Sequence, residues 1–179
     1  MEPHSHEIAL AALQELIAGK QPNAQDLHAV VTALEDLAQQ HADAGAKLKR
    51  AEVLSLLATA LRMRAELAPP KERWRGYADA YEHAKTARDV AVEEATEAGV
   101  NDANLEIYVR ATHEAAHAAL GIGEFDASEE GARLLGEAGD LFAEASAGFH
   151  RLRRASDSSA ANINALKARS MKALRSSDL

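Results

Sequence analysis

The sequence contains no cysteine. Disulfides, thiolate nucleophiles, iron–sulfur clusters and zinc fingers built on sulfur are therefore excluded. No run of residues approaches the roughly 18 consecutive apolar positions of a membrane-spanning helix. The first seven residues have no basic stretch followed by an apolar one, so no secretion signal is expected. Together these absences predict a cytoplasmic protein that does not associate with membranes.

Proline, glycine and aromatic residues are scarce. Among 179 residues there are four prolines and ten glycines, and aromatic residues make up 4%. Few helix-breaking residues favour few, long elements. Much of the 47% hydrophobic content is alanine, which has the highest helix propensity but buries little area per residue. No segment alternates with period two, so the sequence predicts an all-α fold without a β-sheet.

The helical periodicity predicts six to seven amphipathic helices, arranged as a bundle or a short helical-hairpin stack in a single domain over residues 1–179. Gly45 lies between two leucine stripes and either splits a long helix or bends it. A helix must end before Pro70, and glycines 121 and 123 predict a loop. The serine-rich segment 155–159 predicts a joint, that is, a non-helical connection before the last helix. The expected helices cover 5–17, 24–67, a segment from around 74 to about 98, about 102–120, a long helix that starts at Asp126 or Ser128 and reaches 152, and a basic C-terminal helix within 157–179.

One expected helix carries most of the aromatic residues. Trp74, Tyr77 and Tyr81 share a face with Ala84 and Ala91, as the 3.6-residue period requires. Core packing is the leading interpretation of this face, and a platform for ligand stacking is the alternative.

Charge is distributed unevenly along the chain, whose net charge is −8. Residues 1–149 hold 13 basic and 26 acidic residues, whereas residues 150–177 hold seven basic residues and Asp157 alone. The acidic body disfavours nucleic-acid binding except through the basic segment 150–177. That segment is expected to fold back on the acidic body, and the alternative is that it meets an acidic partner.

One motif carries chemistry, the H-E-x-x-H pattern formed by His113, Glu114 and His117. On a helix, residues four apart share a face, so both imidazoles can reach one metal ion. The intervening glutamate can act as general base on a zinc-bound water. A catalytic zinc needs a third protein ligand, and Glu137 lies 20 residues after His117 on the next expected helix.

Over residues 113–140 this arrangement resembles the gluzincin metallopeptidases, the thermolysin-like class. The resemblance implies that His113, His117 and Glu137 are zinc ligands and that Glu114 is the catalytic base. It also implies that Asp140 is an acidic residue behind the ligands. Those enzymes place a β-sheet before the motif helix, whereas every segment upstream of residue 113 predicts helix here.

The competing interpretation of the motif is a solvated helical face. At about 100° per residue, His117 lies nearly opposite the apolar position Tyr108. Glu106, Arg110 and Glu114 follow one another at four-residue spacing, a ladder of charges typical of a face exposed to water.

The leading functional hypothesis is a non-catalytic helical protein-interaction or scaffolding module. It has no cofactor, and its partner is another protein or a second copy of the chain. The alternative is a zinc-dependent hydrolase centred on His113, Glu114, His117 and Glu137. A third interpretation is a nucleic-acid binder that uses residues 150–177.

Overall fold

A computed structural model describes residues 24–177, and these form six helices without any strand. The all-α prediction is thereby confirmed for this part of the chain. The helix expected over residues 5–17 lies outside the described residues. The helices are α2 (Ala24–Asp43), α3 (Lys47–Leu67), α4 (Pro70–Ala98), α5 (Asp102–Phe125), α6 (Glu129–Arg151) and α7 (Ala155–Ser177).

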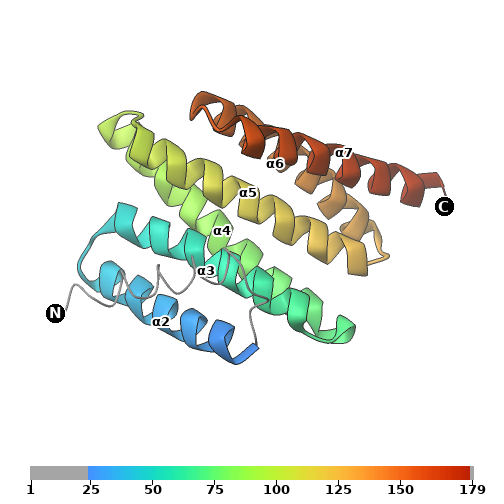
Figure 1. Ribbon diagram of the computed structural model, residues 1–179, viewed down its shortest axis with the longest axis horizontal. Coiled ribbons are helices and arrows are strands. Elements are labelled where there is room, and N and C mark those ends of the chain that lie inside the picture. The colour runs from blue at the N-terminus through green and yellow to red at the C-terminus, as the bar shows by residue number, and fades with distance from the viewer. Residues whose placement is uncertain (1–23, 178–179) are drawn as a thin grey trace.

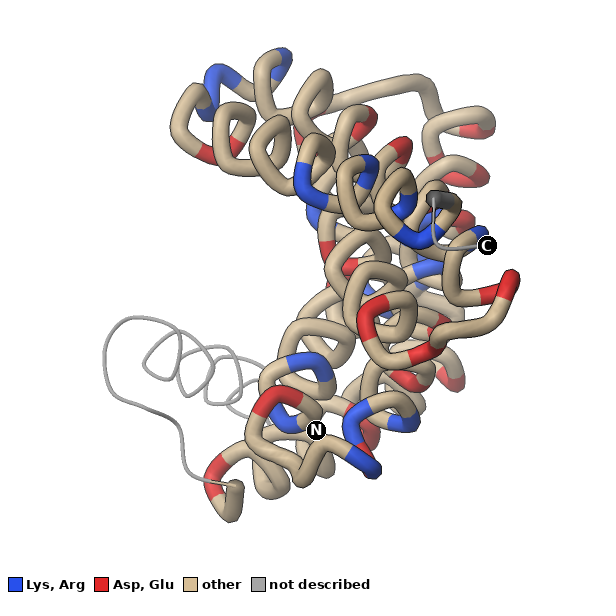
Figure 2. The backbone as a smooth tube through the Cα atoms, turned by 90° about the vertical axis from the view of Figure 1, so that its right-hand side faces the viewer, with Lys and Arg blue, Asp and Glu red and all other residues tan. Residues whose placement is uncertain are grey.

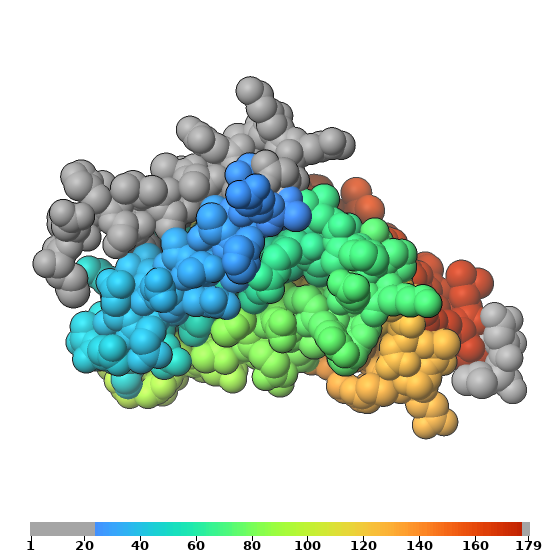
Figure 3. Space-filling view, turned by 90° about the horizontal axis from the view of Figure 1, so that it is seen from below, coloured from blue at the N-terminus to red at the C-terminus, as the bar shows by residue number. Residues whose placement is uncertain are grey.

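The helices pack one after another in chain order. Each contacts its neighbour in sequence, and α3 also contacts α5. Figure 1 shows α2 and α3 at one side of the molecule and α7 at the opposite side, with α4 and α5 between them. The space-filling view from the α2 side shows α2, α3 and α4 in front, with the end of α7 farther along (Figure 3). Among the helices of residues 24–177, none combines the length and the apolar character that a membrane span requires.

Several helix boundaries follow directly from local sequence. Gly45 adopts a φ of 65°, a left-handed conformation that glycine tolerates, and it separates α2 from α3. The side chain of Asn101 accepts hydrogen bonds from the backbone of Ala103 and Asn104 at the start of α5. Ser128 caps α6 in the same way through the Gly131 amide. These residues satisfy amide groups that the first helical turn leaves without partners.

The loop expected at residues 121–123 is wrong, because α5 continues through both glycines to Phe125. A Cβ atom at Gly121 would lie 2.7 Å from the ring of Tyr77 on α4, and one at Gly123 would lie 2.8 Å from Leu135 on α6. These glycines therefore allow neighbouring helices to approach closely. They do not end the helix, because tertiary packing outweighs the weak helix propensity of glycine.

The serine-rich joint expected at 155–159 is also wrong, since α7 begins at Ala155. The Ser158 amide donates to the carbonyl of Arg154 at 3.0 Å, and the Ser146 hydroxyl of α6 donates to the carbonyl of Ser158 at 2.9 Å. Serine and aspartate are favoured in the first turn of a helix. The segment that resembles a linker is therefore the N-terminal turn of α7.

The basic C-terminal helix folds back on the acidic body. On α7, Lys167 pairs with Glu124 at 2.8 Å and Arg169 pairs with Asp140 at 3.3 Å. Arg175 donates to the backbone carbonyls of Glu124 and Asp126. Figure 2 shows basic positions spaced along the helix that leads to the C-terminus. The helix α7 packs mainly against α6 and closes one end of the stack.

Candidate functional site

The two motif histidines lie together on α5. The ring centroids of His113 and His117 are 4.6 Å apart, in an edge-to-face arrangement. Both rings are half-buried against α6. His113 contacts Phe142 and Phe149 at centroid distances of 5.6 and 5.4 Å, and His117 contacts Phe142 at 4.8 Å. The helical spacing therefore brings the imidazoles together as predicted, in an aromatic environment.

The side chain of Glu114, between the two histidines in sequence, reaches α3. It is only 7% exposed, and its carboxylate accepts a hydrogen bond from Nε of Arg62 at 2.8 Å. Arg62 also pairs with Glu66 at 2.7 Å. The prediction of a solvated face is therefore wrong for Glu114, because α3 packs over this side of α5. The expected charge ladder survives only in part, as the pair between Glu106 and Arg110 at 3.0 Å.

Burial and charge set the protonation states of the motif. Burial lowers the pKa of His117 to about 3, and the nearby Glu114 carboxylate only partly offsets this effect. Burial also lowers the pKa of His113. Burial opposes ionisation of Glu114, but the charge and hydrogen bond of Arg62 outweigh it and hold the pKa of Glu114 below 4.5. At neutral pH the motif thus consists of two neutral imidazoles and one carboxylate neutralised by arginine.

The fourth residue of the hydrolase hypothesis, Glu137, is engaged at the contact between α4 and α6. The Tyr81 hydroxyl donates to one of its carboxylate oxygens, and Nη1 of Arg133 donates to the other at 2.8 Å. Asp140, the acidic residue that the gluzincin resemblance implies, pairs instead with Arg169. Within residues 24–177, no three His, Asp or Glu residues form a group that could hold a metal ion. The structure thus unites His113, Glu114 and His117 in one turn and places Glu137 in a separate hydrogen-bonded cluster.

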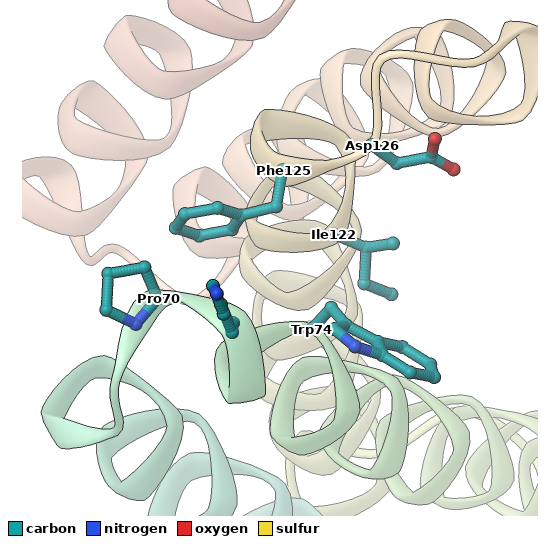
Figure 4. Close-up of a pocket in the computed structure, with 6 residues that line it drawn as sticks. Pro70, Trp74, Ile122, Phe125 and Asp126 are labelled. Carbon is teal, nitrogen blue, oxygen red and sulfur yellow. The ribbon is translucent and has the colours of Figure 1, made fainter.

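A pocket that sequence reasoning missed lies where the start of α4 meets the end of α5. Its volume is about 480 Å³. Trp74 is 50% exposed and Phe125 is 43% exposed, so the pocket is lined by two large, partly solvent-exposed rings. Figure 4 shows Trp74, Ile122 and Phe125 around this opening, with Pro70 and Asp126 at its edges. We call it the Trp74–Phe125 pocket, and its lining residues are Pro70, Lys71, Trp74, Ile122, Phe125 and Asp126.

This pocket divides the aromatic face predicted on α4. Tyr77 and Tyr81 are buried, which agrees with core packing. Trp74, one turn earlier, is half-exposed and belongs to the pocket. The sequence does carry a signal for this difference, because Trp74 stands one turn after Pro69-Pro70, at the end of its helix. The pocket itself could not be predicted, because Phe125 belongs to the turn of α5 that was expected to be a loop.

Basic residues surround the two exposed rings. The guanidinium of Arg73 lies 5.8 Å from the centroid of Phe125, and that of Arg75 lies 5.5 Å from the centroid of Trp74. Both separations are within the range of cation–π attraction. Lys71 lines the pocket. The carboxylate of Asp126, also in the lining, accepts a hydrogen bond from the Ser128 amide at 2.9 Å. Three basic residues, Lys71, Arg73 and Arg75, thus lie at the two rings, together with the carboxylate of Asp126.

A second, more polar pocket of about 350 Å³ adjoins the first and shares Ile122 with it. It lies between α4 and α6, and it includes the cluster of Tyr81, Arg133 and Glu137. On α4, positions 74, 78, 81 and 85 lie on one helical face, and all four line one of the two pockets. The concave surface therefore continues along α4 from an apolar end to a polar end.

Comparison with known proteins does not identify a family for this chain. No protein-family model, no curated protein and no solved structure matches the chain.

Proposed function

We propose that the protein is a non-catalytic helical protein-interaction module that binds a partner segment in the Trp74–Phe125 pocket. The observation that carries this proposal is that Trp74 and Phe125, each about half exposed, line the same mainly apolar pocket. Tryptophan is among the residues that contribute most to binding when an interface covers them. Exposed apolar surface gathered at a pocket is typical of a binding site, whereas isolated exposed side chains are ordinary.

The partner segment that fits this pocket is acidic and carries a bulky apolar side chain. The apolar side chain would lie between Trp74, Ile122 and Phe125. Carboxylates on either side of it would meet Lys71 and the exposed Arg75. Charge complementarity of this kind mainly accelerates association and selects among partners, while the buried apolar anchor contributes most of the affinity.

The zinc-dependent hydrolase has less support. A general base must reach the metal-bound water, but the carboxylate of Glu114 is paired with Arg62. The expected third ligand, Glu137, accepts hydrogen bonds from Tyr81 and Arg133. The favourable observation for a metal is the adjacent pair of neutral imidazoles, which supplies two ligands of the three that a catalytic zinc needs.

The test is a selection of peptides from a random displayed library on the immobilised full chain. Bound peptides are then measured by titration, using the fluorescence of Trp74, which is the only tryptophan in the sequence. We expect peptides with an aromatic or large aliphatic residue flanked by Asp or Glu, and a blue shift of Trp74 emission as water leaves the indole. Phe125→Ser should raise the Kd at least tenfold.

The matched control is Val100→Ser, because Val100 is a highly exposed apolar residue away from the pocket. It should leave the Kd unchanged, and both variants should keep the circular dichroism of the wild type. The proposal fails if the selected peptides bind equally well to the Phe125→Ser variant, or if binding leaves Trp74 emission unaltered.

A further inference from the structure

The last helix, α7, turns its large aliphatic residues towards solvent and its small residues towards the fold. On α7 the residues that face the fold are alanines, and the large aliphatic residues face solvent. Ala161, Ala165 and Ala168 are buried, whereas Ile163, Leu166 and Leu174 are 65–68% exposed. A helix that only closed the end of a stack would present a polar outer surface. We call Ile163, Leu166 and Leu174 the α7 outer face.

The spacing of these residues forms a continuous apolar stripe. Positions 163, 166 and 174 recur at intervals of three and eight residues, which keeps them on one side of a helix. They span eleven residues, or about 16 Å at 1.5 Å per residue. That length matches three turns of a second helix lying along the first. Small serines at positions 159 and 170 lie on the same side, so a partner helix can approach closely.

The basic residues of α7 indicate what kind of partner would cover the α7 outer face. The helix carries Lys167, Arg169, Lys172 and Arg175 against Asp157 alone. Lys167 and Arg169 border the stripe on opposite edges, since Lys167 reaches Glu124 of α5 and Arg169 reaches Asp140 of α6. Both basic residues remain about half exposed. Two copies of α7 packed on each other would bring like charges together, which opposes self-pairing.

We propose that the α7 outer face docks an acidic amphipathic helix of a partner protein. The aliphatic stripe of that helix packs on Ile163, Leu166 and Leu174, and its flanking Asp or Glu residues face Lys167 and Arg169. An anionic membrane fits less well, because the field of a chain whose net charge is −8 opposes approach to an anionic surface. This surface is separate from the Trp74–Phe125 pocket, and the inference does not depend on the function proposed for that pocket.

Two fluorescein-labelled synthetic peptides of about five helical turns serve as probes. Both have leucine at a helical stripe, and they differ only in having glutamate or lysine on the flanks. Fluorescence anisotropy with the full chain should show saturable binding of the glutamate peptide, with a Kd at least tenfold below that of the lysine peptide. The triple variant Ile163→Ser, Leu166→Ser, Leu174→Ser should raise the Kd at least tenfold.

The controls are Val92→Ser, an exposed apolar position on α4, and Phe125→Ser in the pocket. Both should bind the glutamate peptide as the wild type does. The replaced α7 side chains are exposed, so the triple variant should keep the melting temperature and circular dichroism of the wild type. A failure of the function proposed for the Trp74–Phe125 pocket would therefore not affect binding of the glutamate peptide to the α7 outer face.

Three outcomes would overturn the inference. The first is equal affinity for the two peptides, or no effect of the triple variant. The second is a wild-type dimer in sedimentation that the triple variant abolishes, which would make a second copy the occupant. The third is binding to phosphatidylglycerol vesicles that depends on the three aliphatic residues, which would make a lipid surface the occupant.

Discussion

Nε of Arg62 donates to a carboxylate oxygen of Glu114 at 2.8 Å, across 52 positions of the chain. This ion pair joins α3 to α5, and both side chains are largely shielded, with exposures of 18% and 9%. It also holds the carboxylate that a hydrolase would need as its base. The same contact therefore bears on the stability of the fold and on the choice between the two functional hypotheses.

Glu114→Gln tests the contribution of this pair to stability. The substitution leaves the part-buried Arg62 charge with Glu66 as its remaining partner. We expect the free energy of unfolding to fall by about 3 kcal/mol, the lower end of the range for breaking a buried pair. Chemical denaturation measures it. Glu106→Gln, in the more exposed pair with Arg110, should cost about 0.5 kcal/mol or less. Equal effects of the two substitutions would contradict the burial argument.

The half-buried histidines predict a loss of stability in mild acid. Burial lowers the pKa of His117 to about 3, whereas an unfolded histidine titrates near 6.5. Protons therefore bind the unfolded chain first, and stability that is complete above pH 6.5 is lost as the pH falls towards 3. Between pH 7 and pH 5 the loss from His117 is about 2 kcal/mol. Glu114 adds to the loss only as the pH falls through its ordinary value of 4.5.

Denaturation of wild type and His117→Leu at pH 7 and pH 5 checks this prediction. The variant should lose about 2 kcal/mol less than the wild type over this interval. His113 and His83, whose pKa values are also lowered by burial, contribute to both proteins and cancel in the difference. His150→Gln, at an exposed position, should behave as the wild type. An identical pH dependence for His117→Leu and wild type would show that His117 is not desolvated.

Two glycines of α6 should respond oppositely to alanine. A Cβ atom at Gly148 would lie 2.2 Å from Cγ2 of Val109, a branched and fully buried residue of α5. Gly148→Ala should therefore cost about 1–3 kcal/mol through overpacking. A Cβ atom at Gly136 would meet only the flexible end of Lys172 at 2.7 Å. Gly136→Ala should be neutral or stabilise by up to about 1 kcal/mol through helix propensity. Thermal denaturation of both variants gives the comparison, and a destabilised Gly136→Ala would disagree with this packing.

We expect the protein to retain much less than one zinc per chain after zinc is offered and the excess is washed away. Among residues 24–177, only His113 and His117 are placed to act together as ligands, because Glu114 is paired with Arg62 and Glu137 with Arg133. Elemental analysis of wild type and His117→Ala should give the same low value. About one zinc per chain in the wild type, lost in His117→Ala, would favour the hydrolase and direct the next assays to hydrolysis.

Sequence spacing predicts only part of the candidate site. Four-residue spacing correctly placed His113 and His117 on one face of one helix. It assigned Glu114 to a solvated face, because the charges of Glu106 and Arg110 precede it at the same spacing. The actual partner, Arg62, is on another helix, and no periodicity within α5 can identify it. The Trp74–Phe125 pocket was missed for a similar reason, since it combines residues from two helices.

The sequence by itself determined that this part of the chain is helical and where several helices begin and end. Gly45, Asn101 and Ser128 act through backbone conformation and local hydrogen bonds, which neighbouring residues suffice to define. Only the tertiary structure decided that α5 passes through Gly121, that alanines of α7 face inwards, and that Arg62 neutralises Glu114. These outcomes depend on close contact between segments distant in sequence, where the available space and the charge of the opposing helix outweigh local propensity.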